Sequence, residues 1–412
     1  MATVRPFRAA RPQNALASRV VAPPYDVVNR RDAKVIAKRN PCSFLHVTRA
    51  EIDFSWAMDR YSDRVYQQSR ENMKRFFDEN MFFRQEKPAY YLYRQTLDGR
   101  TQTGVVACVS IDEYENGTIK RHEYTLVEKE EDRTRHFDVC DADTEPVFLT
   151  YRADALVNRI TGQWMEKRQP EYDFLTADGV GHALWVVDDD AVIAALAGAF
   201  QSIPCLYIAD GHHRSASAFK VGMKRRENNP AYSGEEEFNF FMAAIFPDSD
   251  LHILEYNRML QNLNGLSEEE FLEEVGKRFF IEEKETPCRP DREHRFGMFL
   301  RDTWYMLEAK PESVPQADVI GALDVSILQD SLLGPVLGVE DPRTDDRIYF
   351  VGGIHGLPVL ERRVRNGLAV AFVLYPVTVS KLLEVADQGL IMPPKSTWFE
   401  PKLGSGLFVH EF

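Results

Sequence analysis

The segment from Cys205 to Gly222, CLYIADGHHRSASAFKVG, constrains the fold more than any other part of the chain, because it joins a strand directly to a helix. Cys205–Ala209 is a short apolar run of the kind that forms a buried strand. Asp210 is a residue type that favours the start of a helix. Gly211 allows a sharp turn, because it has no Cβ atom to clash with the backbone. The segment therefore predicts a β-strand whose carboxyl end leads through one turn into a helix.

The first turn of this predicted helix carries His212, His213 and Arg214, whereas an ordinary helix favours acidic residues there. A helix N terminus has unpaired N–H groups and partial positive charge, so added cations favour an anion, most naturally a phosphate. Small residues at 215–218 would let a neighbour or a ligand approach closely. The alternative is a capped helix whose histidines bond nearby backbone. A zinc site is disfavoured, because adjacent histidines point about 100° apart on a helix and no HExxH or CxxC pattern accompanies them.

The chain of 412 residues is long enough for two or three domains, and 44% of its residues are hydrophobic. No apolar run approaches the roughly 20 residues needed to span a bilayer. The first residues, MATVRPFRAARPQN, lack the apolar centre of a signal peptide. Five scattered cysteines fit a reducing compartment without disulfides, so we expect a soluble cytoplasmic protein. The net charge of −14 argues against broad nucleic-acid binding but leaves room for a local basic pocket.

A second unusual stretch runs from Ile119 to Tyr151 and contains IKRHEYTLVEKEEDRTRHFDVC. A solvated, charged helix is the usual explanation for such a run. Two features favour a functional interpretation instead: the charges alternate in sign within a few residues, and His122 and Glu123 come just after the end of a predicted strand.

Two proline-rich segments are expected to hold polar side chains in fixed places. In VVAPPYDVV, Val20–Val28, two prolines stiffen an extended segment and present Tyr25 and Asp26. A purely structural corner is the alternative there. Near the end of the chain, GLIMPPKSTWFEPKLGSGLF offers Lys395, Ser396 and Thr397, one cation and two hydroxyls suited to a phosphate or carboxylate. Because GxxxxGK[ST] is absent from the sequence, this loop is not of the Walker type.

The remaining pattern predicts a mixed α/β chain without internal repeats. The clearest element is a hairpin over Ala89–Ile111, with its turn at Asp98-Gly99. A long helix is predicted over Phe54–Asn80 with Trp56 in its apolar stripe, a short strand over Pro41–Val47, and a helix over Gln316–Leu333.

Several of these segments together resemble the domain-of-unknown-function family 1015, nearly from end to end. The motifs that carry the resemblance are APPYD at Ala22–Asp26, IKRHE at Ile119–Glu123, the Asp132-Arg133 pair, ADGHHR at Ala209–Arg214, DPRTD at Asp341–Asp345 and MPPKSTWFEPK at Met392–Lys402. Two of these motifs are also similar to motifs of the archaeal ADP-dependent free serine kinases, which belong to the ParB/sulfiredoxin-like superfamily. The matching positions are DGHHR at Asp210–Arg214 and a Pro-Lys-Ser-Thr segment at Pro394–Thr397, where those kinases carry Pro-Lys-Thr-Thr.

The resemblance implies a fold and a domain division. We expect a mixed α/β (α+β) protein with a ParB/sulfiredoxin-like nucleotide- or phosphate-binding core and an additional mixed-sheet region. Residues 1–235 would form this core with an N-terminal extension and a hairpin insert. Residues 236–412 would form a C-terminal α/β region that completes the active site. The polar segment Lys224–Glu237 is either this boundary or a surface loop.

The resemblance also implies an activity: phosphorylation of the hydroxyl of free L-serine, from pyrophosphate or a nucleoside diphosphate, with Mg²⁺ bridging the donor phosphates. Similar members include pyrophosphate-dependent serine kinases, and the IKRHE and KEEDR insert, absent from the archaeal enzymes, leaves the donor open. A ParB-like nucleotide-binding switch and a phosphatase or pyrophosphatase are the alternatives. The sequence assigns neither metal ligands nor an oligomeric state.

The expected roles follow the chemistry of phosphoryl transfer, which needs cations over the phosphate and a carboxylate near the attacking hydroxyl. Glu123 or Asp210 is the expected base. Lys395–Thr397 should approach Gly211–Arg214, and Arg133 should pair with Glu123 or bind phosphate directly. The candidate residues are, for catalysis, Glu123, Asp210, His212 and His213; for phosphate, Gly211, Arg214, Lys395, Ser396, Thr397 and Arg133; and for substrate, Tyr25, Asp26, Arg121 and His122. Asp26 would bind the ammonium of serine, and Arg121 or Thr397 its carboxylate.

Overall fold

A computed structural model describes residues 1–315 and 317–412, and these form two compact units. Unit 1 contains Met1–Leu251 and Pro401–Phe412, and unit 2 contains His252–Glu400. The predicted boundary after residue 235 differs from this division, because Phe240–Pro247 is an inner strand of the sheet of unit 1. The end of the chain also returns to unit 1, so the two predicted regions do not coincide with the two units.

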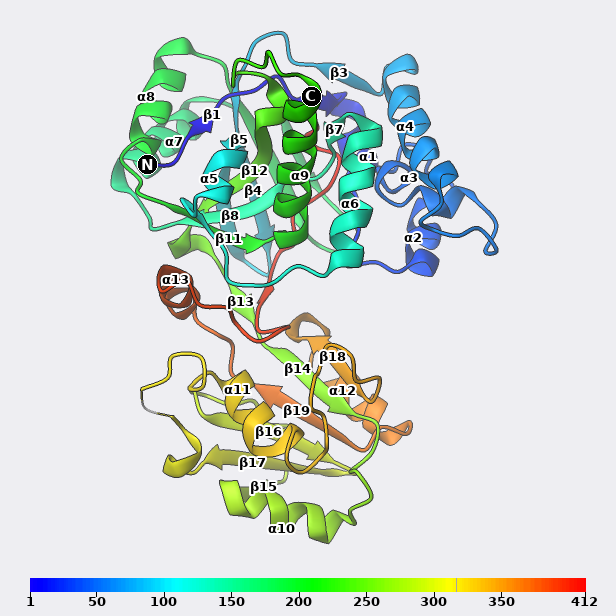
Figure 1. Ribbon diagram of the computed structural model, residues 1–412, viewed down its shortest axis with the longest axis vertical. Coiled ribbons are helices and arrows are strands. Elements are labelled where there is room, and N and C mark those ends of the chain that lie inside the picture. The colour runs from blue at the N-terminus through cyan, green and yellow to red at the C-terminus, as the bar shows by residue number, and fades with distance from the viewer. Residues whose placement is uncertain (316) are drawn as a thin grey trace. The chain divides into compact units, whose positions relative to one another are not determined.

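The centre of unit 1 is a nine-stranded mixed sheet in the order β6-β11-β8-β12-β5-β4-β10-β9, with β1 paired to β5 (Figure 1). Its strands are β1 (Val4–Arg5), β4 (Tyr90–Leu97), β5 (Arg100–Ser110), β6 (Ile119–Lys120), β8 (Val147–Tyr151), β9 (Tyr172–Leu175), β10 (Gly181–Val187), β11 (Leu206–Asp210) and β12 (Phe240–Pro247). The predicted hairpin is confirmed as β4 and β5. Its turn residues, Asp98 and Gly99, have φ values of 51° and 77°, which suits the tight turn of a two-residue hairpin.

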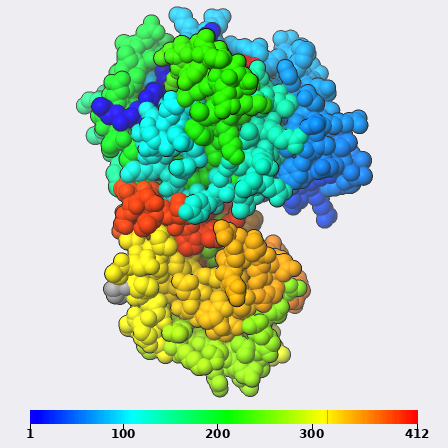
Figure 2. All heavy atoms as spheres, viewed as in Figure 1, coloured from blue at the N-terminus to red at the C-terminus, as the bar shows by residue number. Residues whose placement is uncertain are grey.

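Helices pack on this sheet and beside it. They are α1 (Ala17–Val20), α2 (Arg30–Ala37), α3 (Leu45–Thr48), α4 (Asp63–Asp78), α5 (Ile111–Glu115), α6 (Val127–Cys140), α7 (Ala155–Lys167), α8 (Asp190–Phe200) and α9 (His212–Asn228). Helix α9 packs along α6 and against β12, and α4 packs on the other side of α6 (Figure 1). Figure 2 shows the α5 segment in cyan and the α9 segment in green on the viewer's face of unit 1. Two short pairs, β2 (Ala10–Pro12) with β3 (Phe82–Arg84) and β7 (Ala142–Asp143) with β21 (His410–Glu411), complete unit 1.

Two predicted elements of unit 1 are wrong. The helix predicted over Phe54–Asn80 is only α4, because turns occupy the residues before Ser62. Trp56 therefore lies outside the apolar stripe and is 60% exposed, with the Arg30 guanidinium over its ring. The strand predicted over Pro41–Val47 is a turn followed by α3. Its apolar residues are buried all the same, because Phe44 packs against aromatic rings of α4 and β3; burial of an apolar run does not by itself distinguish a strand from a helix.

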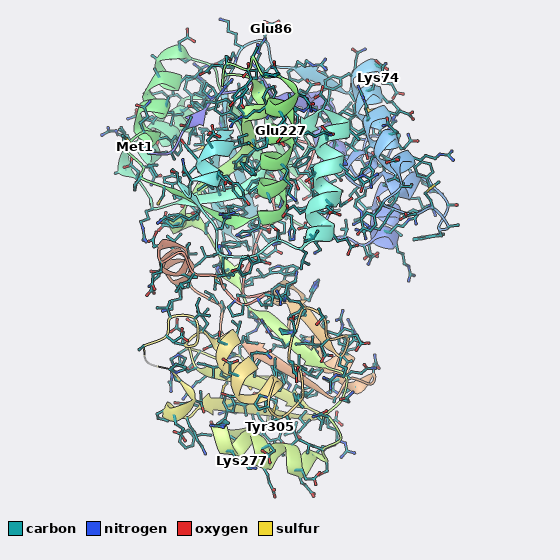
Figure 3. The ribbon with its side chains drawn as sticks, viewed as in Figure 1. Met1, Lys74, Glu86, Glu227, Lys277 and Tyr305 are labelled. Carbon is teal, nitrogen blue, oxygen red and sulfur yellow. The ribbon has the colours of Figure 1, made fainter. Side chains whose placement is uncertain are left out.

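Unit 2 is built on a six-stranded antiparallel sheet in the order β15-β17-β16-β19-β14-β18. The strands are β14 (Tyr256–Leu260), β15 (Phe279–Lys284), β16 (Arg295–Leu300), β17 (Thr303–Ala309), β18 (Ile348–Gly352) and β19 (Val370–Leu374), and a separate pair joins β13 (Ile253–Leu254) to β20 (Trp398–Phe399). The helices are α10 (Glu268–Arg278), α11 (Asp324–Leu328), α12 (Leu357–Arg365) and α13 (Val379–Asp387). Figure 3 marks Lys277 on α10 and Tyr305 on β17.

The helix predicted over Gln316–Leu333 starts at a residue outside the described part of the chain, and its helical portion begins at α11. The predicted mixed α/β class is confirmed: one large mixed sheet and one antiparallel sheet, each with helices. Among residues 1–315 and 317–412, no helix combines the length and apolar character required to cross a bilayer.

Candidate functional site at the carboxyl ends of β6 and β11

The order and direction of three neighbouring strands bring distant parts of the sequence to one edge of the large sheet. β6 runs parallel to β11, with Ile119 opposite Leu206. β8 runs antiparallel to β11, so the residues that precede β8 lie beside the end of β11. Residues that follow β6, follow β11 and precede β8 therefore meet. The strand, turn and helix predicted over Cys205–Gly222 are confirmed as β11, Gly211 and α9, and Gly211 has φ of 99°. Figure 3 marks Glu227 in the last turn of α9, at the opposite end of the helix from this edge.

The two histidine-containing motifs meet at this edge. His122 and Glu123 follow β6, His212 opens α9, and each offers a ligand atom within 4.8 Å of the others. The rings of His122 and His212 pack edge to face, with centroids 4.5 Å apart. Both are almost fully buried, at 1% and 5% exposure. Burial lowers the pKa of His122 to about 4, and burial together with His122 lowers the pKa of His212 well below its ordinary value, so both imidazoles are neutral at pH 7.

Asp210, the last residue of β11, is paired with a lysine from the end of the chain. Lys402 Nζ lies 2.8 Å from Asp210 Oδ2, and Arg214 Nη2 lies 3.9 Å from Oδ1. Burial raises the pKa of Asp210, but Lys402 and Arg214 lower it well below its ordinary value. Asp210 is therefore ionised at neutral pH, and its orientation is set from two sides.

Arg214 and Arg133 are buried, and both are engaged by protein groups. Arg214 donates to the carbonyl of Pro146 at 2.5 Å. Burial lowers its pKa, but Asp26 and Asp210 raise it above its ordinary value. Arg133, on α6, pairs with Asp132 at 2.9 Å and lies 3.9 Å from Glu145.

The APPYD segment reaches the same cluster. The N–H of Tyr25 donates to Glu145 at 3.1 Å, and the Arg133 guanidinium lies 4.0 Å from the centre of the Tyr25 ring. Burial raises the pKa of the Tyr25 hydroxyl, so this hydroxyl is neutral. Asp26 is exposed beside it, and its charge acts on Arg214.

Two further predicted residues lie at the margin of the site. Arg121 is exposed and stacks on the Tyr114 ring at 4.9 Å. His213 Nε2 accepts a hydrogen bond from the N–H of Leu126 at 3.0 Å, so it ties the start of α9 to the segment before α6. This is the backbone-bonded role considered as the alternative for these histidines.

The other segment predicted to bind phosphate, Lys395–Thr397, belongs to unit 2. Lys395 has φ of 59°, and its Nζ lies 5.7 Å from the centre of the Tyr256 ring. The Ser396 hydroxyl donates to the carbonyl of Pro393 at 2.6 Å, which stabilises the loop. The approach of Lys395–Thr397 to Gly211–Arg214 stays a prediction.

Sequence reasoning missed two residues of this cluster. Lys402 is the last residue of MPPKSTWFEPK, and that motif is the only signal for it in the sequence. Glu145 precedes β8 and is fully buried; it accepts hydrogen bonds from the N–H of Tyr25 and, at 2.6 Å, from the Ser405 hydroxyl. Burial raises the pKa of Glu145, and Arg214 and Arg133 oppose that rise. A buried acid just before a strand has no distinctive sequence pattern.

Fold and site together define a mixed α/β protein in which two buried histidines, carboxylates and ion-paired cations gather at one sheet edge beside a helix N terminus. The chain belongs to the family described as "Protein of unknown function (DUF1015)", whose model matches residues 4–326. The comparison with curated protein sequences gave no match.

Three solved structures illustrate the structural comparisons. SbnI with a C-terminal truncation, from Staphylococcus aureus, is 12% identical, with a TM-score of 0.40, over 74% of this chain and 86% of that one. A free serine kinase in complex with AMP is 12% identical, with a TM-score of 0.36, over 71% and 86%. A conserved hypothetical protein from Pyrococcus furiosus is 12% identical, with a TM-score of 0.36, over 74% and 94%.

Proposed function

We propose that this protein is a phosphotransferase that phosphorylates the hydroxyl of free L-serine, with pyrophosphate as the donor. The observation that carries the phosphotransferase part is the start of α9, where the first helical N–H groups follow the Gly211 turn beside the ionised carboxylate of Asp210. The motif resemblance carries the choice of serine and of pyrophosphate. In this proposal the site belongs to a ParB/sulfiredoxin-like core.

The geometry supports phosphoryl transfer because that reaction demands positioning and charge stabilisation more than covalent chemistry. The N–H groups of the first turn of α9 suit the oxygens of a transferred phosphate. Asp210, held by Lys402 and Arg214, is a fixed acceptor for the hydroxyl proton of serine. Glu123 is the other candidate base, and it lies within 4.8 Å of the ligand atoms of His122 and His212.

Mg²⁺ is the expected partner of the donor phosphates. Mg²⁺ takes oxygen ligands and is usually held by one or two carboxylates together with phosphate oxygens. The carboxylates of Glu123 and Asp210 fit that requirement, while the two imidazoles do not. When bound, Mg²⁺ would neutralise the charge of the donor.

The amino-acid acceptor requires groups for an ammonium and a carboxylate. Asp26 is exposed at the margin of the cluster and suits the ammonium, because a carboxylate forms a charge-assisted hydrogen bond with it. Arg121, exposed on the Tyr114 ring, suits the carboxylate of serine.

The direct test is an assay of the full chain by phosphorus NMR. Purified protein is incubated with L-serine and Mg²⁺ and, in separate tubes, with pyrophosphate, ADP or ATP. We expect phosphoserine with pyrophosphate. Absence of phosphoserine in every tube, with folded protein, would reject the kinase. Phosphate release from pyrophosphate without phosphoserine would indicate a pyrophosphatase, and nucleotide binding without turnover would indicate a switch.

The base is tested by the variants Asp210→Asn and Glu123→Gln. A general base contributes about 10²–10⁴-fold to the rate, so the variant that removes it should lower kcat by that factor. A change within about threefold would exclude that residue as the base. Glu128→Gln, a neutralised and exposed acid on α6, is the matched control and should keep wild-type turnover.

A further inference from the structure

The pair of buried imidazoles beside Glu123 has the composition of a metal site. His122, Glu123 and His212 each present one nitrogen or oxygen ligand atom, all within 4.8 Å of one another. Ligands about 2.1 Å from one tetrahedral ion lie about 3.4 Å apart. Side-chain rotations that shorten these separations by up to about 1.4 Å would therefore bring all three into one coordination sphere.

His122 supplies an independent observation. Its side chain is 1% exposed; the Ile208 carbonyl acts on the ring, but within the described ranges neither ring nitrogen makes a hydrogen bond of good geometry. Buried polar groups are normally paired, and one carbonyl can pair only one of the two ring nitrogens, so the other nitrogen needs an explanation. The ring packs on His212, whose Nε2 accepts from the N–H of His122 at 3.4 Å, a long contact. A ligand between the two imidazoles and Glu123 would satisfy the nitrogen that the protein leaves unpaired.

The fold explains how these ligands come together from positions far apart in the sequence. β6 and β11 are parallel neighbours, and His122 and His212 each follow the end of one of them by two residues. Zinc was disfavoured from the sequence because His212 and His213 diverge on their helix. The two side chains do point in different directions, because His213 accepts a hydrogen bond from the N–H of Leu126. The histidine that lies beside His212 is instead His122.

We propose that His122, Glu123 and His212 bind one divalent transition-metal ion of the Mn²⁺, Fe²⁺, Co²⁺ or Zn²⁺ class. Imidazole nitrogens suit Fe²⁺ and Zn²⁺, a carboxylate also suits Mn²⁺, and Mg²⁺ and Ca²⁺ take oxygen ligands. Three protein ligands leave coordination positions open for water or for oxygens of a bound anion.

This inference does not depend on the phosphotransferase proposal, because it concerns the ion alone. If both hold, Glu123 is a ligand of the transition-metal ion and is neither the base nor a ligand of Mg²⁺, so Asp210 is left as the acceptor for the proton of the substrate. Asp210 is already oriented by Lys402 and Arg214 rather than by the histidines.

The test is metal binding by the full chain, measured without turnover. The protein is stripped with a chelator and titrated with Mn²⁺, followed by electron paramagnetic resonance of the free ion. It is then titrated with Co²⁺, followed by visible absorption. We expect one ion per chain, no displacement by millimolar Mg²⁺, and a visible Co²⁺ spectrum that reports nitrogen ligands. Absence of Mn²⁺ and Co²⁺ binding would overturn the proposal, as would equal competition by Mg²⁺.

Variants assign the ligands. Loss of a group that only orients a ligand costs about 10–100-fold in metal affinity, so His122→Gln and His212→Gln should each weaken Co²⁺ binding by about 100-fold or more. Glu123 is only partly buried, so Glu123→Gln keeps the test decisive if a histidine variant fails to fold. His136→Gln is the matched control, because His136 is equally buried in unit 1 but bonds to Thr144. Wild-type affinity in Glu123→Gln, or a similar loss in His136→Gln, would refute the assignment.

Discussion

Replacing Asp324 with asparagine should stabilise unit 2, and the gain should grow with pH. Asp324 opens α11 and is 6% exposed. Its Oδ1 accepts from the N–H of His294 at 2.8 Å, and the backbone of Tyr375 also acts on the carboxylate, while the buried Oδ2 has no hydrogen bond of good geometry among the residues described. The acid Glu293 and the cation Lys381 line the same small cavity. An asparagine keeps the accepting oxygen and carries no charge, so it removes the cost of burying an ionised group.

The size of the effect follows from the pKa. Burial raises the pKa of Asp324 from 3.8 to about 7, against the hydrogen bond from His294. The folded protein therefore holds the proton over a range in which the unfolded chain has lost it, so wild-type stability falls as the pH rises from about 4 to about 7. Each pKa unit corresponds to 1.36 kcal/mol, which gives a fall of about 4 kcal/mol. About a quarter of this fall has occurred by pH 4.5, so the stability of Asp324→Asn relative to wild type should rise by about 3 kcal/mol between pH 4.5 and pH 8.

The measurement must report on unit 2 separately. Pulse hydrogen exchange in increasing urea, read by mass spectrometry on peptides that cover β16 and β19, gives the free energy of unfolding of that sheet. Asp302→Asn is the control, because the Asp302 side chain is 72% exposed in a surface pair with Arg365 and such pairs contribute little. A difference between Asp324→Asn and wild type that stays constant to within about 0.5 kcal/mol from pH 4.5 to 8 would refute the reasoning, because the linkage requires it to change.

Two further predictions concern the candidate site. Gly211→Ala should lower the melting temperature more than Gly99→Ala, measured by circular dichroism. Both residues have positive φ, a conformation that costs other residues about 1–2 kcal/mol. A Cβ atom added to Gly211 would also lie 3.1 Å from Arg214 Nε, which is a close contact. A Cβ atom added to Gly99 would have none of the described atoms within 4 Å. Lys402→Met should lower turnover about tenfold or more, because a hydrogen bond to a charged group is worth about 1.5–3 kcal/mol and this one orients Asp210. Lys74→Met, which breaks an exposed pair with Asp78, should change neither turnover nor stability, and equal losses in the two lysine variants would contradict the role of Lys402.

The parts of the fold that could be predicted are those determined by neighbouring residues. The β4–β5 hairpin has its register set by Asp98 and Gly99, and β11 with α9 is set by an apolar run and one glycine. The helix predicted over Phe54–Asn80 failed where periodicity alone was used: Trp56 falls in the helical stripe, but turns precede Ser62. Apolar spacing is compatible with a helix without requiring one.

The residue types of the site could be predicted from local sequence, but their proximity to one another could not. The sequence singles out His122, Glu123 and His212 as unusual, because charged and titratable residues directly follow apolar runs. Their mutual proximity depends on the parallel pairing of β6 with β11, which is a choice of strand order and has no local signal. The pairing of Lys402 with Asp210 likewise depends on the return of the chain end to unit 1.

The charges at the assembled site differ from those expected for the first turn of α9, which was predicted to bind an anion through three cations. Of its three predicted cations, His212 is neutral at pH 7, His213 accepts a backbone hydrogen bond, and Arg214 is engaged by Pro146 and by carboxylates. The acids around Arg214 oppose a bare phosphate, because each contributes repulsion at short range, and burial strengthens that repulsion. A cation placed between those acids and the phosphate converts the repulsion into attraction on both sides. The geometry therefore favours an anion that arrives with a divalent ion, or that meets one already held by the protein, over an anion bound by side-chain cations alone.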